Sequence, residues 1–287
     1  MDYQRICDVV CEDLSTENYH SGIVWAAKYC DALKNYFHTH LKREINFFIN
    51  ENRENERRYD SAFIVKDASG VYNIHVGIGL FINIINGIDD FDSEKINKCL
   101  EKFEYRDDIH VIVAKNYIFI SSIFVFINHE IIHALLLHEK KHSDVALSQE
   151  ICADCCGGQL METLYYELLK NIRSKFPEFE NCEAITSGLI FIGIMYGIWK
   201  YNSIYFDNDL TTHPHLRIRP MYVSGALMIS LEDLGHPPKV MSRNFFYLYN
   251  LFYSMDSEEY NQFMAKKTVE CMPCFEEVYL LNQQLKE

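Results

Sequence analysis

Apolar residues recur every three or four positions from Ser21 to about Asn50, and this rhythm predicts one long amphipathic helix. Between 61 and 81, apolar and polar residues alternate instead, which predicts two strands. Gly70 can supply the positive φ that a tight turn between them needs. The uncharged stretch 71–88 is interpreted as sheet rather than a membrane span, because Ile74, Val76, Ile78 and Leu80 alternate with other residues and because His75 and three asparagines interrupt the apolar run.

The middle of the chain predicts a strand followed by two helices. Residues 109–120 are rich in side chains that favour strands. Ser121 and Ser122 are expected to begin a helix that carries FVFINHEIIHALLLHE. A second helix is predicted from about Ser148 to Lys175. Earlier in the chain, Ser93 is expected to cap a short helix.

These elements predict an α+β fold in a single unit spanning residues 1–287. A core at 109–220 is expected to be elaborated by helical segments at 1–60 and 221–287. The run 184–199 has no charge but is shorter than the roughly 20 residues that cross a membrane. A buried core helix is therefore predicted there, and membrane association is not favoured.

Charge and cysteine content narrow the function further. The net charge of −14 argues against nucleic-acid binding, which needs a basic surface. Ten cysteines spread over 287 residues do not resemble a compact disulfide scaffold. The first residues lack the basic and apolar regions of a secretory leader. A cytoplasmic, reducing location is expected.

The segment His129-Glu130-Ile131-Ile132-His133 is an H-E-x-x-H motif. Residues four apart share one face of a helix, so both imidazoles can reach one ion, and neutral imidazole suits Zn²⁺. Glu130 can accept a proton from the water that the metal activates. The apolar residues around the motif indicate a buried helix, in which the His-Glu-His face needs a compensating partner. His138 and His142 are instead expected to be surface or outer histidines.

Glu150 is the predicted third ligand. It lies 17 residues after His133, enough for the chain to reverse and return beside the first helix. Asp154 is four residues further on the same face and can accept the free ring N–H of a ligating histidine. Gly157 and Gly158 permit a close approach of two helices. Without the upstream H-E-x-x-H motif, Glu150 and Asp154 would also suit the exposed face of an amphipathic helix.

Together, HEIIH and EICAD resemble the gluzincin arrangement H-E-x-x-H…E-x-x-x-D of zinc metallopeptidases. The E-x-x-A-D form is similar to that of the heat-shock and CAAX-prenyl peptidases, and a downstream His213-Pro214 followed by arginine agrees. This resemblance covers 129–219. It implies a zincin-like core, in which an active-site helix and a glutamate helix pack on a small sheet whose edge strand binds extended peptide.

The resemblance also implies roles for residues around the metal. His213 is expected to stabilise the transition-state oxyanion, because Pro214 restrains it in an extended conformation. Two arginines could match the family's arginine: Arg217 is followed by Ile218, as in the family's Arg-Ile dipeptide, whereas Arg219 lies at the family's distance from His213-Pro214. The family's paired transmembrane helices are not evident. In its length, the chain also resembles the Lit-type phage-exclusion peptidases.

The predicted function is hydrolysis of peptide bonds in a protein or peptide by a zinc-bound water, with Glu130 as general base. The alternative is a regulatory protein that binds zinc without turnover; a hydrolase of other amides and a membrane peptidase stay open. Cys152 and Cys155 could join Cys271 and Cys274 in a second, structural zinc site. Against that site, the two pairs lie 116 residues apart.

Overall fold

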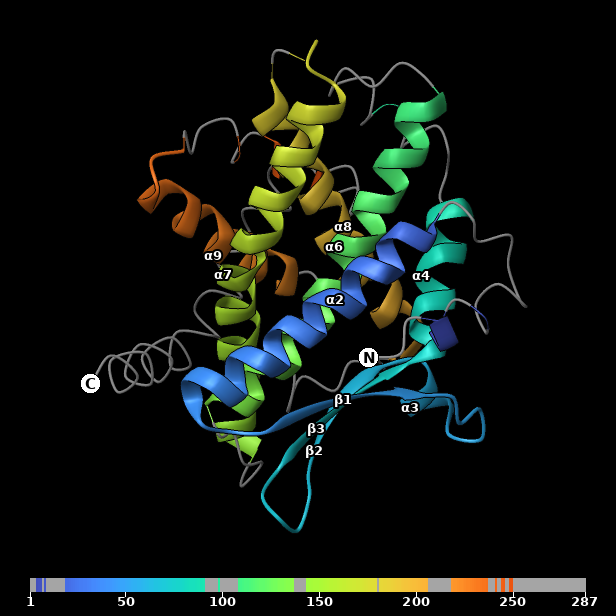
Figure 1. Ribbon diagram of the computed structural model, residues 1–287, viewed down its shortest axis with the longest axis vertical. Coiled ribbons are helices and arrows are strands. Elements are labelled where there is room, and N and C mark those ends of the chain that lie inside the picture. Colours follow the sequence, from blue (N-terminus) through green and yellow to red (C-terminus); the bar gives the residue numbers. More distant parts are fainter. Residues whose placement is uncertain are drawn as a thin grey trace.

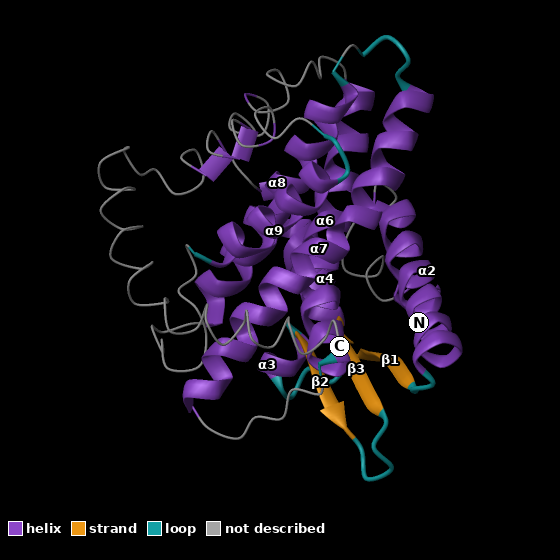
Figure 2. Ribbon diagram, turned by 90° about the vertical axis from the view of Figure 1, so that its left-hand side faces the viewer, coloured by secondary structure: helices purple, strands orange, loops and turns teal. Residues whose placement is uncertain are grey.

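The computed structural model describes much of the chain and joins a bundle of helices to a small sheet at one end (Figures 1 and 2). The described residues are 4–6, 8, 19–90, 98, 108–136, 143–179, 181–205, 218–236, 241, 244–245 and 248–249. Within them, the fold is mostly helical with a three-stranded mixed sheet, so the α+β class is confirmed.

The sheet has the strand order β1-β3-β2, with β1 at Ile45–Asn50, β2 at Ala62–Lys66 and β3 at Tyr72–Gly77. Strands β2 and β3 form the expected antiparallel hairpin, while β1 runs parallel to β3. Gly70 adopts a φ of 87° in the hairpin turn. Asp67 Oδ1 accepts hydrogen bonds there from the backbone N–H of Ser69 and of Val71.

The predicted helix at 21–50 is wrong in its last part. Helix α2 covers His20–Tyr36 and continues into the π-helical turn η2, Phe37–Leu41. Lys42 then adopts a left-handed φ of 53°, which ends the helix, and 45–50 form β1. The strand forms because β3 offers a parallel partner along all six residues.

Two predicted sheet segments are helices in the structure. Residues 78–88 belong to α4, Ile78–Asp90, which follows β3 directly. The short helix α3, Glu56–Tyr59, lies between β1 and β2 in the chain. Residues 109–120 belong to α6, Asp108–Leu135. Ser121 and Ser122 therefore lie inside α6 rather than at its start, and each hydroxyl donates to a backbone carbonyl four residues earlier. Burial among other helices outweighs the local strand preference of β-branched side chains.

The central helix α6 packs against α2, against α7, Ser143–Lys175, and against α8, Cys182–Tyr205. The helix predicted from Ser148 to Lys175 is confirmed with an earlier start. The buried helix predicted at 184–199 is also confirmed, because every residue from 185 to 198 is buried. The short helix expected after Ser93 lies outside the described residues, apart from residue 98.

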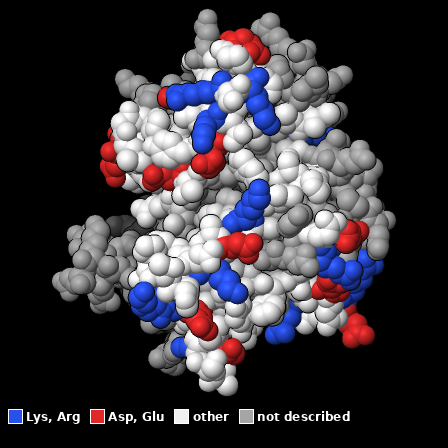
Figure 3. Space-filling view, viewed as in Figure 1, with Lys and Arg blue, Asp and Glu red and all other residues white. Residues whose placement is uncertain are grey.

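Helix α9, Arg219–Asp233, lies against α7. The last turn of α7 carries Arg173 and Lys175, and basic side chains there complement the carbonyl end of a helix. On the face seen in Figure 3, acidic and basic side chains of the described residues are interspersed. Arg173 joins α7 to α8 through an ion pair with Glu183 at 3.1 Å.

Among the described residues, one helix segment, Ile112–Leu135 of α6, is long and apolar enough to cross a membrane. In the fold, 89% of its most apolar 18-residue window is buried. A core helix of a folded protein passes the same test of length and composition. Because a strand is predicted for 109–120, the sequence does not reveal that α6 is one long apolar helix.

Helices α6 and α8 approach closely at Gly193. A Cβ atom on Gly193 would lie 2.4 Å from the Cβ of Ser121 and 2.6 Å from the carbonyl oxygen of Ile118. The Ser122 hydroxyl, which is close to the carbonyl of Ile118, also lies within hydrogen-bonding distance of the carbonyl oxygen of Gly193, at 2.8 Å. The two backbones therefore meet where only a hydrogen atom fits.

We expect Gly193→Ala to lower the free energy of unfolding by about 1–3 kcal/mol, because the added methyl group overpacks this contact. Gly225→Ala is the matched control, since no described atom lies within 4 Å of a Cβ at Gly225 in α9. That change should stabilise the protein by up to about 1 kcal/mol through helix propensity. Urea denaturation measures both, and equal effects of the two changes would contradict the close contact.

Candidate metal centre

Two neighbouring helices bring the predicted ligands together. His129 and His133 lie one turn apart on α6, and Glu150 lies in the N-terminal part of α7. One ligand atom from each of the three residues lies within 4.8 Å of the other two. All three side chains are buried, with Glu150 only 3% exposed. The H-E-x-x-H spacing and the return of the chain through α7 thus converge on one point.

The distances between these atoms suit a small cation. His129 Nε2 lies 3.1 Å from His133 Nε2 and 2.9 Å from Glu150 Oε2. His133 Nε2 lies 3.6 Å from Glu150 Oε1. A tetrahedral zinc ion with bonds of about 2.0–2.1 Å separates its ligand atoms by about 3.3 Å. The donor set fits such an ion with small adjustments.

Asp154 and Arg219 contact His129 at Nδ1, the ring nitrogen that does not face the other two ligands. Asp154 Oδ1 lies 2.9 Å from His129 Nδ1. Arg219 donates to both oxygens of Asp154, through Nε at 2.8 Å and Nη2 at 2.7 Å. Arg219 Nη2 also lies 3.3 Å from His129 Nδ1. A guanidinium cannot accept a hydrogen bond, so Arg219 Nη2 and His129 Nδ1 both donate to Asp154 Oδ1. His129 Nε2 is then left to face Glu150 and His133.

The charges of the cluster call for one more cation. Burial opposes ionisation of Asp154, but the Arg219 guanidinium holds the pKa of that carboxyl below its usual range. Burial also opposes ionisation of Glu150, and the adjacent His129 lowers its pKa well below the usual range. Although burial disfavours a charged imidazole, Glu150 and Asp154 raise the pKa of His129 to about 10. In the absence of a metal, a proton on His129 supplies the missing positive charge.

Two adjacent glycines of α7 face its neighbouring helices at this level. A Cβ on Gly157 would lie 3.4 Å from the backbone nitrogen of His129 on α6. On the other side of α7, a Cβ on Gly158 would lie 2.2 Å from the carbonyl oxygen of Val223 on α9. The contact between α7 and α9 therefore requires glycine at 158, whereas a Cβ at 157 would make only ordinary van der Waals contact with α6.

Asn128 is a supporting residue that the sequence analysis missed. Its side chain is fully buried. Its amide nitrogen lies 3.4 Å from the carbonyl of Gly157, and its oxygen accepts a 2.6 Å hydrogen bond from the hydroxyl of Tyr29. The available signal was a single amide in the otherwise apolar stretch before His129. Asn128 ties α6 to α7 and to α2 directly beside the first ligand.

Of the other residues predicted for the site, the structure describes Glu130 and Arg219. Glu130 follows His129 on α6 and is partly exposed, so solvent reaches it, while its role as base stays a prediction. Of the two candidate arginines, Arg219 contacts Asp154. The described residues do not include the following positions: His138, His142, His213, Arg217, Cys271 and Cys274.

The cysteines of α7 lie on its side toward Ile218 and Tyr222. Cys152 and these two residues form a small apolar cluster, against which Cys155 packs. The sulfur of Cys152 lies 3.8 Å from that of Cys156. Buried cysteine commonly serves as a small apolar residue, and Cys152 packs in this way, while the second zinc site stays a prediction.

In comparisons with known proteins, no family model, no curated protein and no solved structure matches the chain.

The ion pair between Asp154 and Arg219 should be strongly coupled, since both side chains are buried. In chelator-treated protein, Arg219→Met should lower the free energy of unfolding by about 3–5 kcal/mol, because it leaves a buried carboxylate without its guanidinium. Adding Asp154→Asn to Arg219→Met should recover part of this loss. Urea denaturation of the two single variants and the double variant measures the coupling, and purely additive effects would contradict it.

Proposed function

We propose that this chain is a zinc metallopeptidase that hydrolyses peptide bonds in a protein or peptide substrate. The observation that carries the proposal is the convergence of His129, His133 and Glu150, with His129 oriented by Asp154. Two imidazoles and one carboxylate are a ligand set used by catalytic zinc sites, which leave a fourth position open. The helix pair α6 and α7 beside a small sheet is compatible with a zincin-like core.

The buried cluster supports catalysis as well as metal binding. Zinc, when bound, acts as a Lewis acid and makes a bound water acidic near neutral pH. Glu130 is the base in this proposal, since it follows the first ligand directly and, unlike the three ligands, is partly exposed. A carboxylate in that position can take a proton from water and pass it to the leaving amine. Arg219 holds the pKa of Asp154 low, and Asp154 lies against His129 Nδ1, so that His129 Nε2 would be the atom that holds a zinc ion.

Substrate binding and oxyanion stabilisation extend the proposal. Strands β1 and β2 form the two edges of the sheet, and an edge strand can pair with an extended peptide through backbone hydrogen bonds. His213 is proposed as the second donor to the oxyanion, opposite the metal. This role rests on the His213-Pro214 pattern in the sequence.

Purified protein prepared without chelators should contain about one zinc per chain, because the three ligands converge on one point. The double variant His129→Ala/His133→Ala should lose this zinc, and Glu150→Gln should bind it more weakly. Lys34→Met, a change on the exposed surface of α2, is the control and should keep it. Elemental analysis by mass spectrometry decides, and a zinc content that the double variant does not change would contradict the site.

Glu130→Gln should separate chemistry from metal binding, since glutamine keeps the shape of the side chain but cannot serve as a base. We expect zinc content to stay near one per chain while cleavage falls by a factor of about 10² or more. Incubation of a peptide library with each protein, followed by mass spectrometry of new termini, measures the difference. Zinc without cleavage products in the unaltered protein would refute the peptidase and favour a zinc-binding regulator, and full activity of Glu130→Gln would refute the mechanism.

A further inference from the structure

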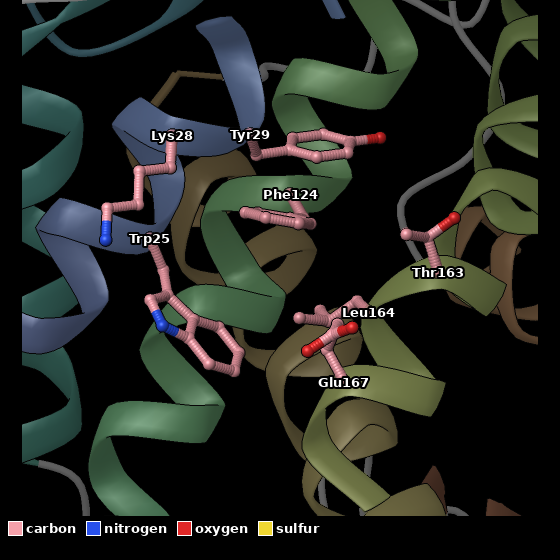
Figure 4. A pocket seen from close by; sticks show the side chains of 7 residues that line it. All are labelled: Trp25, Lys28, Tyr29, Phe124, Thr163, Leu164 and Glu167. Carbon is pink, nitrogen blue, oxygen red and sulfur yellow. The ribbon is translucent and has the colours of Figure 1, made fainter. Parts of the chain in front are cut away.

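A cavity of about 260 Å³ lies between α2, α6 and α7, apart from the metal cluster (Figure 4). Its lining residue on α6 is Phe124, five residues before His129. Five residues turn an α-helix by about 500°, so Phe124 points about 140° away from His129 around the helix axis. The cavity and the metal cluster therefore use different sides of α6. The residues lining the cavity are Trp25, Lys28, Tyr29, Phe124, Thr163, Leu164 and Glu167.

The inner walls of the cavity are aromatic and fixed in place. The rings of Tyr29 and Phe124 stack with centroids 4.1 Å apart and an interplanar angle of 19°. The Tyr29 hydroxyl is held by its 2.6 Å hydrogen bond to Asn128. Trp25 projects from α2 and Leu164 from α7 toward the same space in Figure 4. A flat apolar group can therefore enter between walls that are already formed.

The rim of the cavity carries one charge of each sign. Lys28 extends from α2 and Glu167 from α7, on opposite sides of the cavity (Figure 4). Both side chains are exposed, and neither forms an ion pair within the described residues. Their long side chains can turn toward a group bound between them. Charge complementarity thus favours a ligand with both an ammonium and a carboxylate group.

We propose that this cavity binds a free α-amino acid with an aromatic side chain. The ring of the ligand lies against Trp25 and Phe124, its ammonium group faces Glu167, and its carboxylate faces Lys28. The volume suits one such molecule, because ligand cavities for larger molecules begin at about 300 Å³. An apolar ligand without charges would leave both rim groups unmatched. The site does not depend on the proposed peptidase activity.

The experiment is isothermal titration of the metal-loaded protein with L-phenylalanine and with two analogues that each lack one charge. Phenethylamine lacks the carboxylate and 3-phenylpropanoate lacks the ammonium group. L-phenylalanine should bind saturably and about tenfold more tightly than either analogue, because each charged hydrogen bond adds to the affinity. Zinc content, measured on the same sample, keeps this result separate from the fate of the peptidase proposal.

Two variants assign the charges. Lys28→Met should abolish the preference for L-phenylalanine over phenethylamine while keeping the preference over 3-phenylpropanoate. Glu167→Gln should have the opposite pattern, and Trp25→Leu should weaken all three ligands. Lys34→Met, elsewhere on α2, should change none of these, and thermal denaturation checks that each variant is folded. The proposal is overturned by the absence of saturable binding at about 10 mM L-phenylalanine, by equal affinity for the analogues, or by preferences that Lys28→Met and Glu167→Gln leave unchanged.

Discussion

The distance between α6 and α7 is the constraint on which the candidate centre depends, because its ligands come from both helices. The backbone of α7 lies close to that of α6 at this level, where a Cβ on Gly157 would be in ordinary van der Waals contact with the backbone nitrogen of His129. Asn128 then joins the two helices, and Tyr29 extends this connection to α2. A functional cluster needs its side chains held to within about 0.5 Å, and long side chains alone do not provide such precision. The direct packing of α6 on α7, with the Asn128 amide against the carbonyl of Gly157, limits how far the ligands can move apart.

The buried charges of the cluster make its members interdependent. Arg219 stands at the first residue of α9, so its bond to Asp154 also anchors that helix to α7. Asp154 in turn orients His129, and His129 faces Glu150. Removing a single member leaves another buried charge without a partner, which costs more than the bond itself contributes. A substitution of any of these residues is therefore expected to change both the stability of the fold and the geometry of the cluster.

Local patterns predicted the motif helix, the glutamate helix and the β2–β3 hairpin, because the residues of each pattern are close in the sequence. Non-local contacts decide the rest. The segment 45–50 is a strand because it pairs with 72–77, a partner that helical periodicity cannot reveal. Residues 109–120 are helical because α6 is buried among α2, α7 and α8. The hydrogen bond between Tyr29 and Asn128 spans 99 positions, and no spacing rule anticipates it.

The apolar character of α6 has a consequence for biosynthesis. Residues 112–135 are as apolar as a membrane span, and most of that surface is covered in the folded protein. Two of the helices that cover it, α7 and α8, come later in the chain, at 143–175 and 182–205. During translation, α6 is therefore synthesised before two of the helices that cover it. We expect the nascent chain to pass through an interval in which the apolar surface of the helix that carries both histidines is exposed and open to chaperones.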